Sequence, residues 1–263
     1  MTAAPTPPPP GADPTVSSRF RRLRALNVAA AAFLGAQAIF MLLAGKELRL
    51  PLTAAFLTDD PVRVTGPGKA TSVFSLPIGA TVAAFLLLAA ADHFLVAAPR
   101  VHRWYERGLA RQVNYARWIE YSISASLMIV LIGVFVGVRD VAAVTAVFAA
   151  NSAMILFGLL MERQQRPGSV DWSAFVFGSL IGAVPWALVV GYLLQPATVP
   201  GFVYAIAGVQ FVLFFSFALN MALQYAQVGR WRNYLHGEVT YILLSFTAKS
   251  LLAWLIFANV LRP

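Results

Sequence analysis

The chain has 263 residues, of which 59% are hydrophobic and only 12% are charged, with a mean hydropathy of +0.70. Soluble globular proteins carry about 25% charged residues, so this composition excludes them and indicates an integral membrane protein. The absence of cysteine excludes disulfides and thiolate metal sites. The net charge of +9 comes from basic residues between apolar runs, which is typical of membrane topology and argues against nucleic-acid binding.

The first 18 residues, MTAAPTPPPPGADPTVSS, contain a proline run and no apolar periodicity. This composition predicts a disordered tail, separate from a membrane domain that covers residues 19–263. The first apolar run has no small-residue cleavage pattern behind it, so we expect no signal peptide.

Gaps between charged residues locate the membrane spans, because a helix that crosses a bilayer needs about 20 largely uncharged residues. The gap from Asp171 to Arg230 is long enough for two helices, and the stretch QPATVPG at 195–201 divides it. The predicted spans are residues 25–44, 71–97, 113–138, 141–161, 174–194, 203–226 and 239–260. The sequence therefore predicts an all-α bundle of seven transmembrane helices.

The basic residues are unevenly distributed between the two sets of connections. Arginines concentrate in residues 19–24, 100–111, 163–166 and 230–232, which all lie on one side of the predicted bundle. The positive-inside rule then places the N-terminus in the cytoplasm and the C-terminus outside, in a multi-pass protein of the cell membrane. The long extracellular connection, residues 45–70, contains LRLPLTAAFL and is expected to hold a strand or hairpin.

Few ionisable residues remain inside the spans. Lys249 lies about ten residues into the last span, or ~15 Å from its start, which is near the midplane. An unpaired charge at that depth costs about 3 kcal/mol, so Lys249 needs a partner, and Glu120 in the third span is the best candidate. Arg117 is one turn from Glu120 and is also expected near it. Asp92 and His93 lie at a similar depth in the second span.

Two interpretations of Lys249 stay open on these residues. The first is a plain ion pair with Glu120 that bridges two helices. The second is covalent, because a desolvated lysine keeps a free amine that can condense with an aldehyde to form a Schiff base. Met154 and Trp186 fit either interpretation, since such side chains pack bundle cores and also surround flat conjugated ligands.

The chain resembles the heliorhodopsins, a family of retinal-binding membrane proteins with inverted topology. The resemblance rests on RWIEYSISAS at 117–126, NMALQY at 220–225, LHGE at 235–238 and YILLSFTAKSLLAW at 241–254, and extends from the first span to the seventh. It implies all-trans retinal as cofactor, bound to Lys249 as a protonated Schiff base, with Glu120 as counterion and Ser245 as hydrogen-bonding neighbour. It also implies a cytoplasmic-cavity role for His93, and positions that line or support the chromophore at Tyr121, Asn151, Met154, Trp186 and Trp254.

This chain departs from the family pattern in its first span, ALNVAAAAFLGAQAIFMLLA. The family commonly has a histidine there that joins the same cavity as His93, whereas this span has none and offers Gln37. The hydrogen-bond network of that cavity is therefore expected to differ in this chain.

The resemblance implies a light-absorbing photoreceptor and no enzyme. A light-driven proton pump needs acidic relays on both sides of the Schiff base, but after Glu120 the third span runs YSISASLMIVLIGVFVGV with no acid. We therefore expect a photosensor with a slow photocycle and no ion pumping. The alternatives are a light-driven ion transporter, or a small transporter or channel without retinal that uses the Lys249–Glu120 pair. Expected partners are membrane lipid, a second copy through the extracellular loop, and an unidentified cytoplasmic signalling protein, but no nucleic acid.

Overall fold

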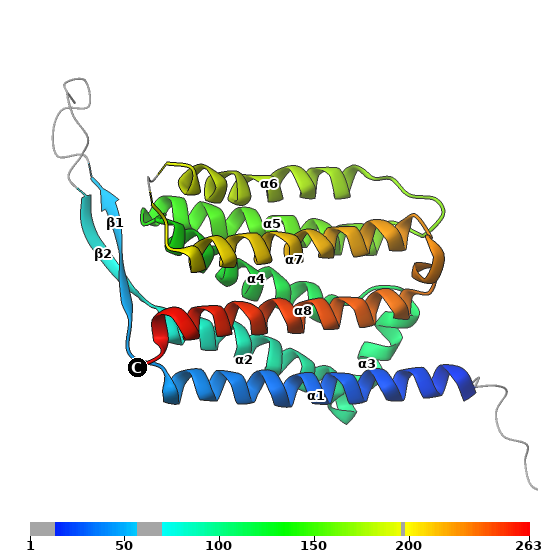
Figure 1. Ribbon diagram of the computed structural model, residues 1–263. Helices are drawn as coiled ribbons and strands as arrows, with labels where there is room; N and C mark the ends of the chain where they lie inside the picture. Colours follow the sequence, from blue (N-terminus) through cyan, green and yellow to red (C-terminus); the bar gives the residue numbers. More distant parts are fainter. Residues whose placement is uncertain (1–13, 57–69, 196–197) are drawn as a thin grey trace, which may run out of the picture.

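The computed structural model describes residues 14–56, 70–195 and 198–263, which form a bundle of long helices (Figure 1). Seven of the described helices are long and apolar enough to cross a membrane, which confirms the predicted fold. They are α1 (Pro14–Ala44), α2 (Ile78–Ala97), α4 (Tyr115–Val136), α5 (Val141–Gln164), α6 (Ser173–Leu193), α7 (Gly201–Tyr225) and α8 (Tyr234–Ile256).

Shorter elements connect or extend these helices. They are the strands β1 (Arg49–Ala55) and β2 (Ala70–Pro77), the helix α3 (Pro99–Ala110), a 3-10 helix at Gly229–Arg232 and a π-helical turn at Phe257–Leu261. The two strands pair in antiparallel register and stand at the end of the bundle near the C-terminus (Figure 1). The predicted strand in the first long connection is thus confirmed by β1.

The structure corrects two predicted boundaries and adds one helix. The second span was predicted to begin at Thr71, but residues 70–77 pair with β1 as strand β2, and the helix starts only after Pro77. The connection after α2 contains the helix α3, which the span analysis missed. Residues 14–18, which were predicted to belong to the tail, form the start of α1. Residues 1–13 of the predicted tail and residues 57–69 of the long connection lie outside the described residues.

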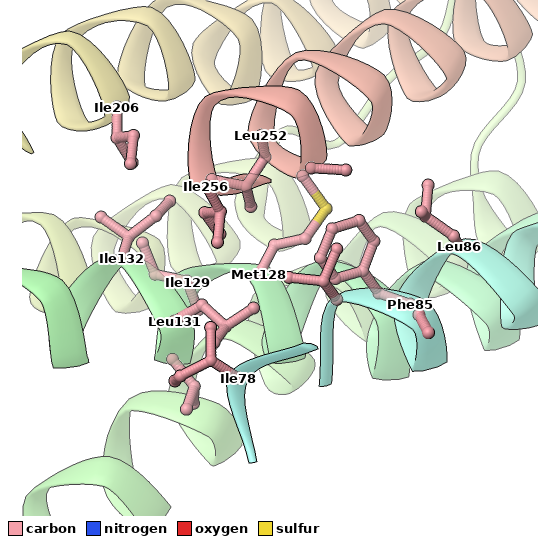
Figure 2. Packing of buried hydrophobic residues seen from close by; sticks show 14 of the residues in the cluster. Ile78, Phe85, Leu86, Met128, Ile129, Leu131, Ile132, Ile206, Leu252 and Ile256 are labelled. Atoms are coloured by element: carbon pink, nitrogen blue, oxygen red, sulfur yellow. The ribbon is translucent and has the colours of Figure 1, made fainter. Parts of the chain in front are cut away.

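Apolar packing is concentrated where α2, α4, α7 and α8 meet. Figure 2 shows this cluster, in which side chains from the four helices point toward one another. Its fully buried members include Ile78, Phe85, Leu86, Met128, Ile129, Leu131, Ile132, Ile206, Leu252 and Ile256. On α4 and α8 these residues follow Glu120 and Lys249 along the chain, so the buried charges lie on one side of this hydrophobic cluster.

Two glycines allow large side chains to enter between the helices. A Cβ atom on Gly158 of α5 would lie 2.5 Å from the ring of Trp118, and one on Gly182 of α6 would meet the sulfur of Met154. A Cβ atom at either position would force the facing Trp118 or Met154 side chain to shift. The glycines thereby make room for Trp118 and Met154 between α4, α5 and α6.

The two ends of the bundle differ in charge. We call the end that holds residues 19–24, α3, residues 163–166 and residues 230–232 the basic end, because arginines cluster there. The opposite end, here the hairpin end, holds β1, β2 and the C-terminus (Figure 1). Seven crossings put the two chain ends on opposite sides of a membrane, and the cytoplasmic location of the basic end stays a prediction.

Candidate functional site

A buried lysine and a buried glutamate meet in the middle of the bundle. Lys249 of α8 is 2% exposed and Glu120 of α4 is 8% exposed. The Lys249 Nζ atom donates to the Ser245 hydroxyl at 2.7 Å and lies 3.4 Å from each carboxylate oxygen of Glu120. Ser245 reaches the amine because residues four apart share one face of a helix. The Lys249–Glu120 pairing predicted from the sequence is therefore present in the geometry.

The Lys249–Glu120 contact is longer than a usual charge-assisted hydrogen bond of about 2.7–2.9 Å. Glu120 Oε1 forms no hydrogen bond with any described residue, and neither does the fully buried hydroxyl of Ser124, which lies one turn further along α4. The ring of Tyr121 covers the other side of the amine, with Nζ 4.8 Å from the ring centroid. The positive charge is therefore held by one carboxylate, one hydroxyl and one aromatic face.

A cavity of about 380 Å³ begins at Lys249 and extends between α4, α5, α6, α7 and α8. Its volume falls in the range of about 300–1,000 Å³ that is typical of small-molecule sites. Besides Lys249 and Ser245, the wall is mostly apolar and rich in aromatic rings, including Trp118, Tyr121, Trp186, Phe211, Phe214 and Phe217. An apolar ligand with one polar end would place that end at Lys249.

Three of the predicted chromophore residues line this cavity, namely Tyr121, Met154 and Trp186. Trp186 packs edge-to-face on Phe211 and Phe214, with ring centroids 5.2 and 5.5 Å apart. Tyr121 donates its hydroxyl to the Tyr241 carbonyl at 3.0 Å, which fixes its ring beside Lys249. These contacts hold flat side chains in defined orientations around the open volume.

Asn151 and His93 lie outside the cavity wall. Asn151 is buried and its amide donates to the Ser126 hydroxyl at 3.1 Å, so it ties α5 to α4. His93 is buried on α2, and its Nδ1 atom lies 2.7 Å from the Oδ1 atom of Asn27 on α1. Gln37, by contrast, donates to the Ser250 hydroxyl at 3.0 Å. The first-helix partner of His93 is therefore Asn27, a residue that the sequence reasoning did not single out.

Trp254 is the one predicted chromophore residue that the structure places on the outer surface. Its side chain is 41% exposed and packs against Phe40 of α1 and against Phe257, with ring centroids 5.4 and 5.8 Å away. Trp254 is five residues from Lys249, so it lies on a different face of α8. Trp254 does not line the cavity at Lys249, so a supporting role for it beside the chromophore stays a prediction.

Arg117 does not pair with Glu120 as predicted. Its guanidinium group instead binds Glu162 of α5 and Glu238 of α8, and all three side chains are buried. We call Arg117, Glu162 and Glu238 the arginine cluster. Both glutamates lie just outside the predicted spans, because Glu162 directly follows the span 141–161 and Glu238 directly precedes the span 239–260. The signal available in the sequence was the position of LHGE directly before the apolar run of α8.

Further donors saturate the two carboxylates of the arginine cluster. Glu162 accepts from the backbone N–H of Asn114 at 3.0 Å, the Trp118 indole at 2.7 Å and the Tyr234 hydroxyl at 3.3 Å. Glu238 accepts from the Asn114 side chain at 2.8 Å and the Tyr105 hydroxyl at 3.0 Å. Burial and the neighbouring Glu238 carboxylate raise the pKa of Tyr105 well above its usual range, so this phenol remains a donor.

Trp118 belongs to both the cavity and the arginine cluster. Its ring lines the cavity, while its indole N–H bonds Glu162. The Arg117 guanidinium also lies over the ring of Tyr241, 4.0 Å from the centroid, and Tyr241 packs edge-to-face on Trp118. The wall of the cavity is therefore connected through direct contacts to the basic end of the bundle.

Comparison with known proteins gives one family and one fold. The family model for heliorhodopsin matches residues 23–261. Among solved structures, the chain is similar to the crystal structure of a light-driven proton pump, LR (Mac), from Leptosphaeria maculans, with a TM-score of 0.57 and 13% sequence identity. That match covers 95% of this chain and 97% of the other, and at this identity it shows the fold alone. No curated protein sequence matches the chain.

Replacing Arg117 with glutamine should destabilise the protein by about 3–5 kcal/mol, because two buried carboxylates would lose their counter-charge. Thermal or denaturant unfolding in detergent measures this loss. The control is Arg163→Gln, an exposed position at the same end of the bundle, where about 0.5 kcal/mol or less is expected. Equal stability of the two variants would show that the arginine cluster does not hold the helices together.

Proposed function

Since the chain belongs to the heliorhodopsin family of retinal photoreceptors, we propose that Lys249 carries retinal as a protonated Schiff base with Glu120 as counterion. The family membership and the seven apolar helices make it a multi-pass integral membrane protein. The proposal assigns each group of the site a role in holding the chromophore and its charge.

The position of Lys249 at the polar end of an apolar cavity is the observation that carries this proposal. A lysine amine can condense with an aldehyde to form an imine. The wall that leads away from it is mostly apolar and rich in aromatic rings, which suits a conjugated polyene. When bound, all-trans retinal would supply the visible absorption and a light-driven change of shape to the 13-cis form.

Glu120 supports the positive charge on the Lys249 nitrogen. A protonated imine keeps the charge of the ammonium, so the carboxylate 3.4 Å away stabilises that form, and the Ser245 hydroxyl at 2.7 Å adds a hydrogen-bonding neighbour. Glu120 Oε1 has no competing hydrogen bond with described residues, which leaves its charge available to the nitrogen. Asn151 would support the site by tying α5 to α4 through Ser126. His93 would support it by linking α2 to α1 through Asn27.

We favour a photosensor without ion transport over a pump. Beyond Glu120 the rest of α4 contains no acid, and neither do residues 239–261 at the end of the chain. A proton leaving the Lys249 nitrogen would therefore find no carboxylate relay along α4 or α8 toward the hairpin end. On the other side, the arginine cluster connects the cavity wall to the basic end, which offers a path for a structural signal to a cytoplasmic partner.

A homodimer is also part of the proposal. Phe56, Val73 and Phe74 expose apolar side chains on or beside the hairpin. Such a group of exposed apolar residues at one end of the molecule favours contact with another surface, and a second copy of the chain offers the same group.

The variant Lys249→Ala should bind no retinal covalently, because it lacks the amine, and it should show no visible absorption band after incubation with all-trans retinal. Absorption spectroscopy of the purified protein gives the result. Lys46→Ala, which changes a lysine outside the bundle, should retain the band. A coloured Lys249→Ala protein would overturn the attachment site.

Glu120→Gln should shift the absorption band to longer wavelength, because the negative charge that stabilises the positive nitrogen in the ground state is removed. The absorption spectrum measures the shift. Glu106→Gln removes a carboxylate from α3 instead and should leave the band in place. If the two variants absorb at the same wavelength as the parent protein, Glu120 is not the counterion.

Illumination of vesicles that contain the protein should cause no pH change sensitive to a protonophore, because α4 and α8 carry no acid between the Lys249–Glu120 pair and the hairpin end. A pH electrode in an unbuffered vesicle suspension makes the measurement, with a known proton pump in matched vesicles as the positive control. A light-driven pH shift abolished by the protonophore would instead support the transporter alternative.

A further inference from the structure

Helix α3 lies across the basic end of the bundle, at an angle to the seven long helices (Figure 1). Its inner face carries Tyr105 and Leu109, which are buried with Leu23, Val96 and Tyr234. The Tyr105 hydroxyl also bonds Glu238 of the arginine cluster at 3.0 Å. These contacts fix the rotation of α3 about its own axis, so its outer face has a defined direction.

The outer face of α3 carries a stripe of four arginines, Arg100, Arg103, Arg107 and Arg111. Their spacing of three or four residues places them on one side of the helix, and all four side chains are exposed. Trp104 lies within the same stripe and is 45% exposed. Among the residues that the structure describes, none of these arginines forms an ion pair with a carboxylate. The acid within α3, Glu106, is turned toward His102, 3.3 Å away.

The location of α3 determines what can neutralise this stripe. The helix follows the last residue of α2 almost directly and ends shortly before α4 begins, so it lies where two membrane spans leave the bilayer. Lipid phosphates occupy that level. An exposed tryptophan is typical of the headgroup region, and a guanidinium group pairs with phosphate through two parallel hydrogen bonds.

We infer that the outer face of α3 binds the headgroups of anionic phospholipids through Arg100, Arg103, Arg107 and Arg111, with Trp104 inserted beside them. Helices with one basic side and an aromatic residue at the interface bind anionic membranes in this way. The lipid surface is favoured over an acidic protein because α3 already lies beside it, and because Trp104 suits an interface that is partly apolar. The inference is independent of the proposed photoreceptor function, since it requires no chromophore.

The experiment measures lipid selectivity of the full chain in bilayers that contain equal amounts of phosphatidylcholine and phosphatidylglycerol. Electron paramagnetic resonance reports how much of each spin-labelled lipid is immobilised by the protein. The parent protein should prefer phosphatidylglycerol by about fivefold or more. The variant R100Q/R103Q/R107Q/R111Q should lose most of that preference.

The matched control is R163Q/R166Q/R230Q/R232Q, which removes four exposed arginines from the same end of the bundle without touching α3. It should retain most of the preference. Equal losses in the two variants would overturn the inference, because the effect would then come from the general charge of the basic end. Absence of any preference in the parent protein would also overturn it and leave an acidic protein as the partner of the stripe.

A smaller variant and a second readout keep the test decisive even if the fourfold variant does not fold. R103Q/R107Q removes half of the stripe and should lose an intermediate part of the preference, while its melting temperature should stay near that of the parent. Lipids brominated close to the headgroup should quench more tryptophan fluorescence in the parent than in Trp104→Phe. Identical quenching of these two proteins would place Trp104 outside the headgroup region and contradict the inference.

Discussion

The need to neutralise one buried positive charge shapes the centre of this molecule. Lys249 is enclosed by a bundle of apolar helices, where an ammonium ion without a partner is strongly disfavoured. Two helices supply its partners, which are the Glu120 carboxylate on α4 and the Ser245 hydroxyl one turn away on α8 itself. Because both partners must reach the same nitrogen, α4 and α8 have to sit at a fixed depth relative to each other. The cavity then opens from that point.

Helix α4 carries a second buried charge, Arg117, one turn before Glu120, and the signs of the paired charges are reversed there. At Glu120 an acid of α4 meets a base of another helix, whereas at Arg117 a base of α4 meets acids of two others. The two residues are neighbours on α4, yet they do not pair with each other. Glu120 pairs with α8, and Arg117 pairs with α5 and α8. These ion pairs fix the positions of α4, α5 and α8 relative to one another. Trp118 lies between the two sites and contacts both the cavity and Glu162.

Much of the fold could be predicted from the gaps between charged residues. A chain that crosses a bilayer must form long uncharged helices, so few alternative structures are possible for each gap. The rule failed at residues 70–77, where an apolar stretch forms an edge of the hairpin, since low charge alone does not distinguish a strand from a helix. It also counted α3 as a loop, because an amphipathic surface helix is not apolar enough to register. Within the site, Lys249, Glu120 and Ser245 followed from depth and helical spacing. Glu162, Glu238 and Asn27 did not, because their partners depend on the relative rotation of helices that are far apart in sequence.

The contact between His93 and Asn27 fixes which nitrogen of the imidazole carries hydrogen. The Asn27 amide group donates to the Leu23 carbonyl at 3.0 Å, so its Oδ1 atom is the end that faces His93. An oxygen of this kind only accepts, and Nδ1 of His93 must therefore be the protonated nitrogen. In the neutral ring, this leaves the lone pair on Nε2. A single asparagine in the first helix thus selects the tautomer of a histidine in the second, and with it the nitrogen through which that ring can accept a proton.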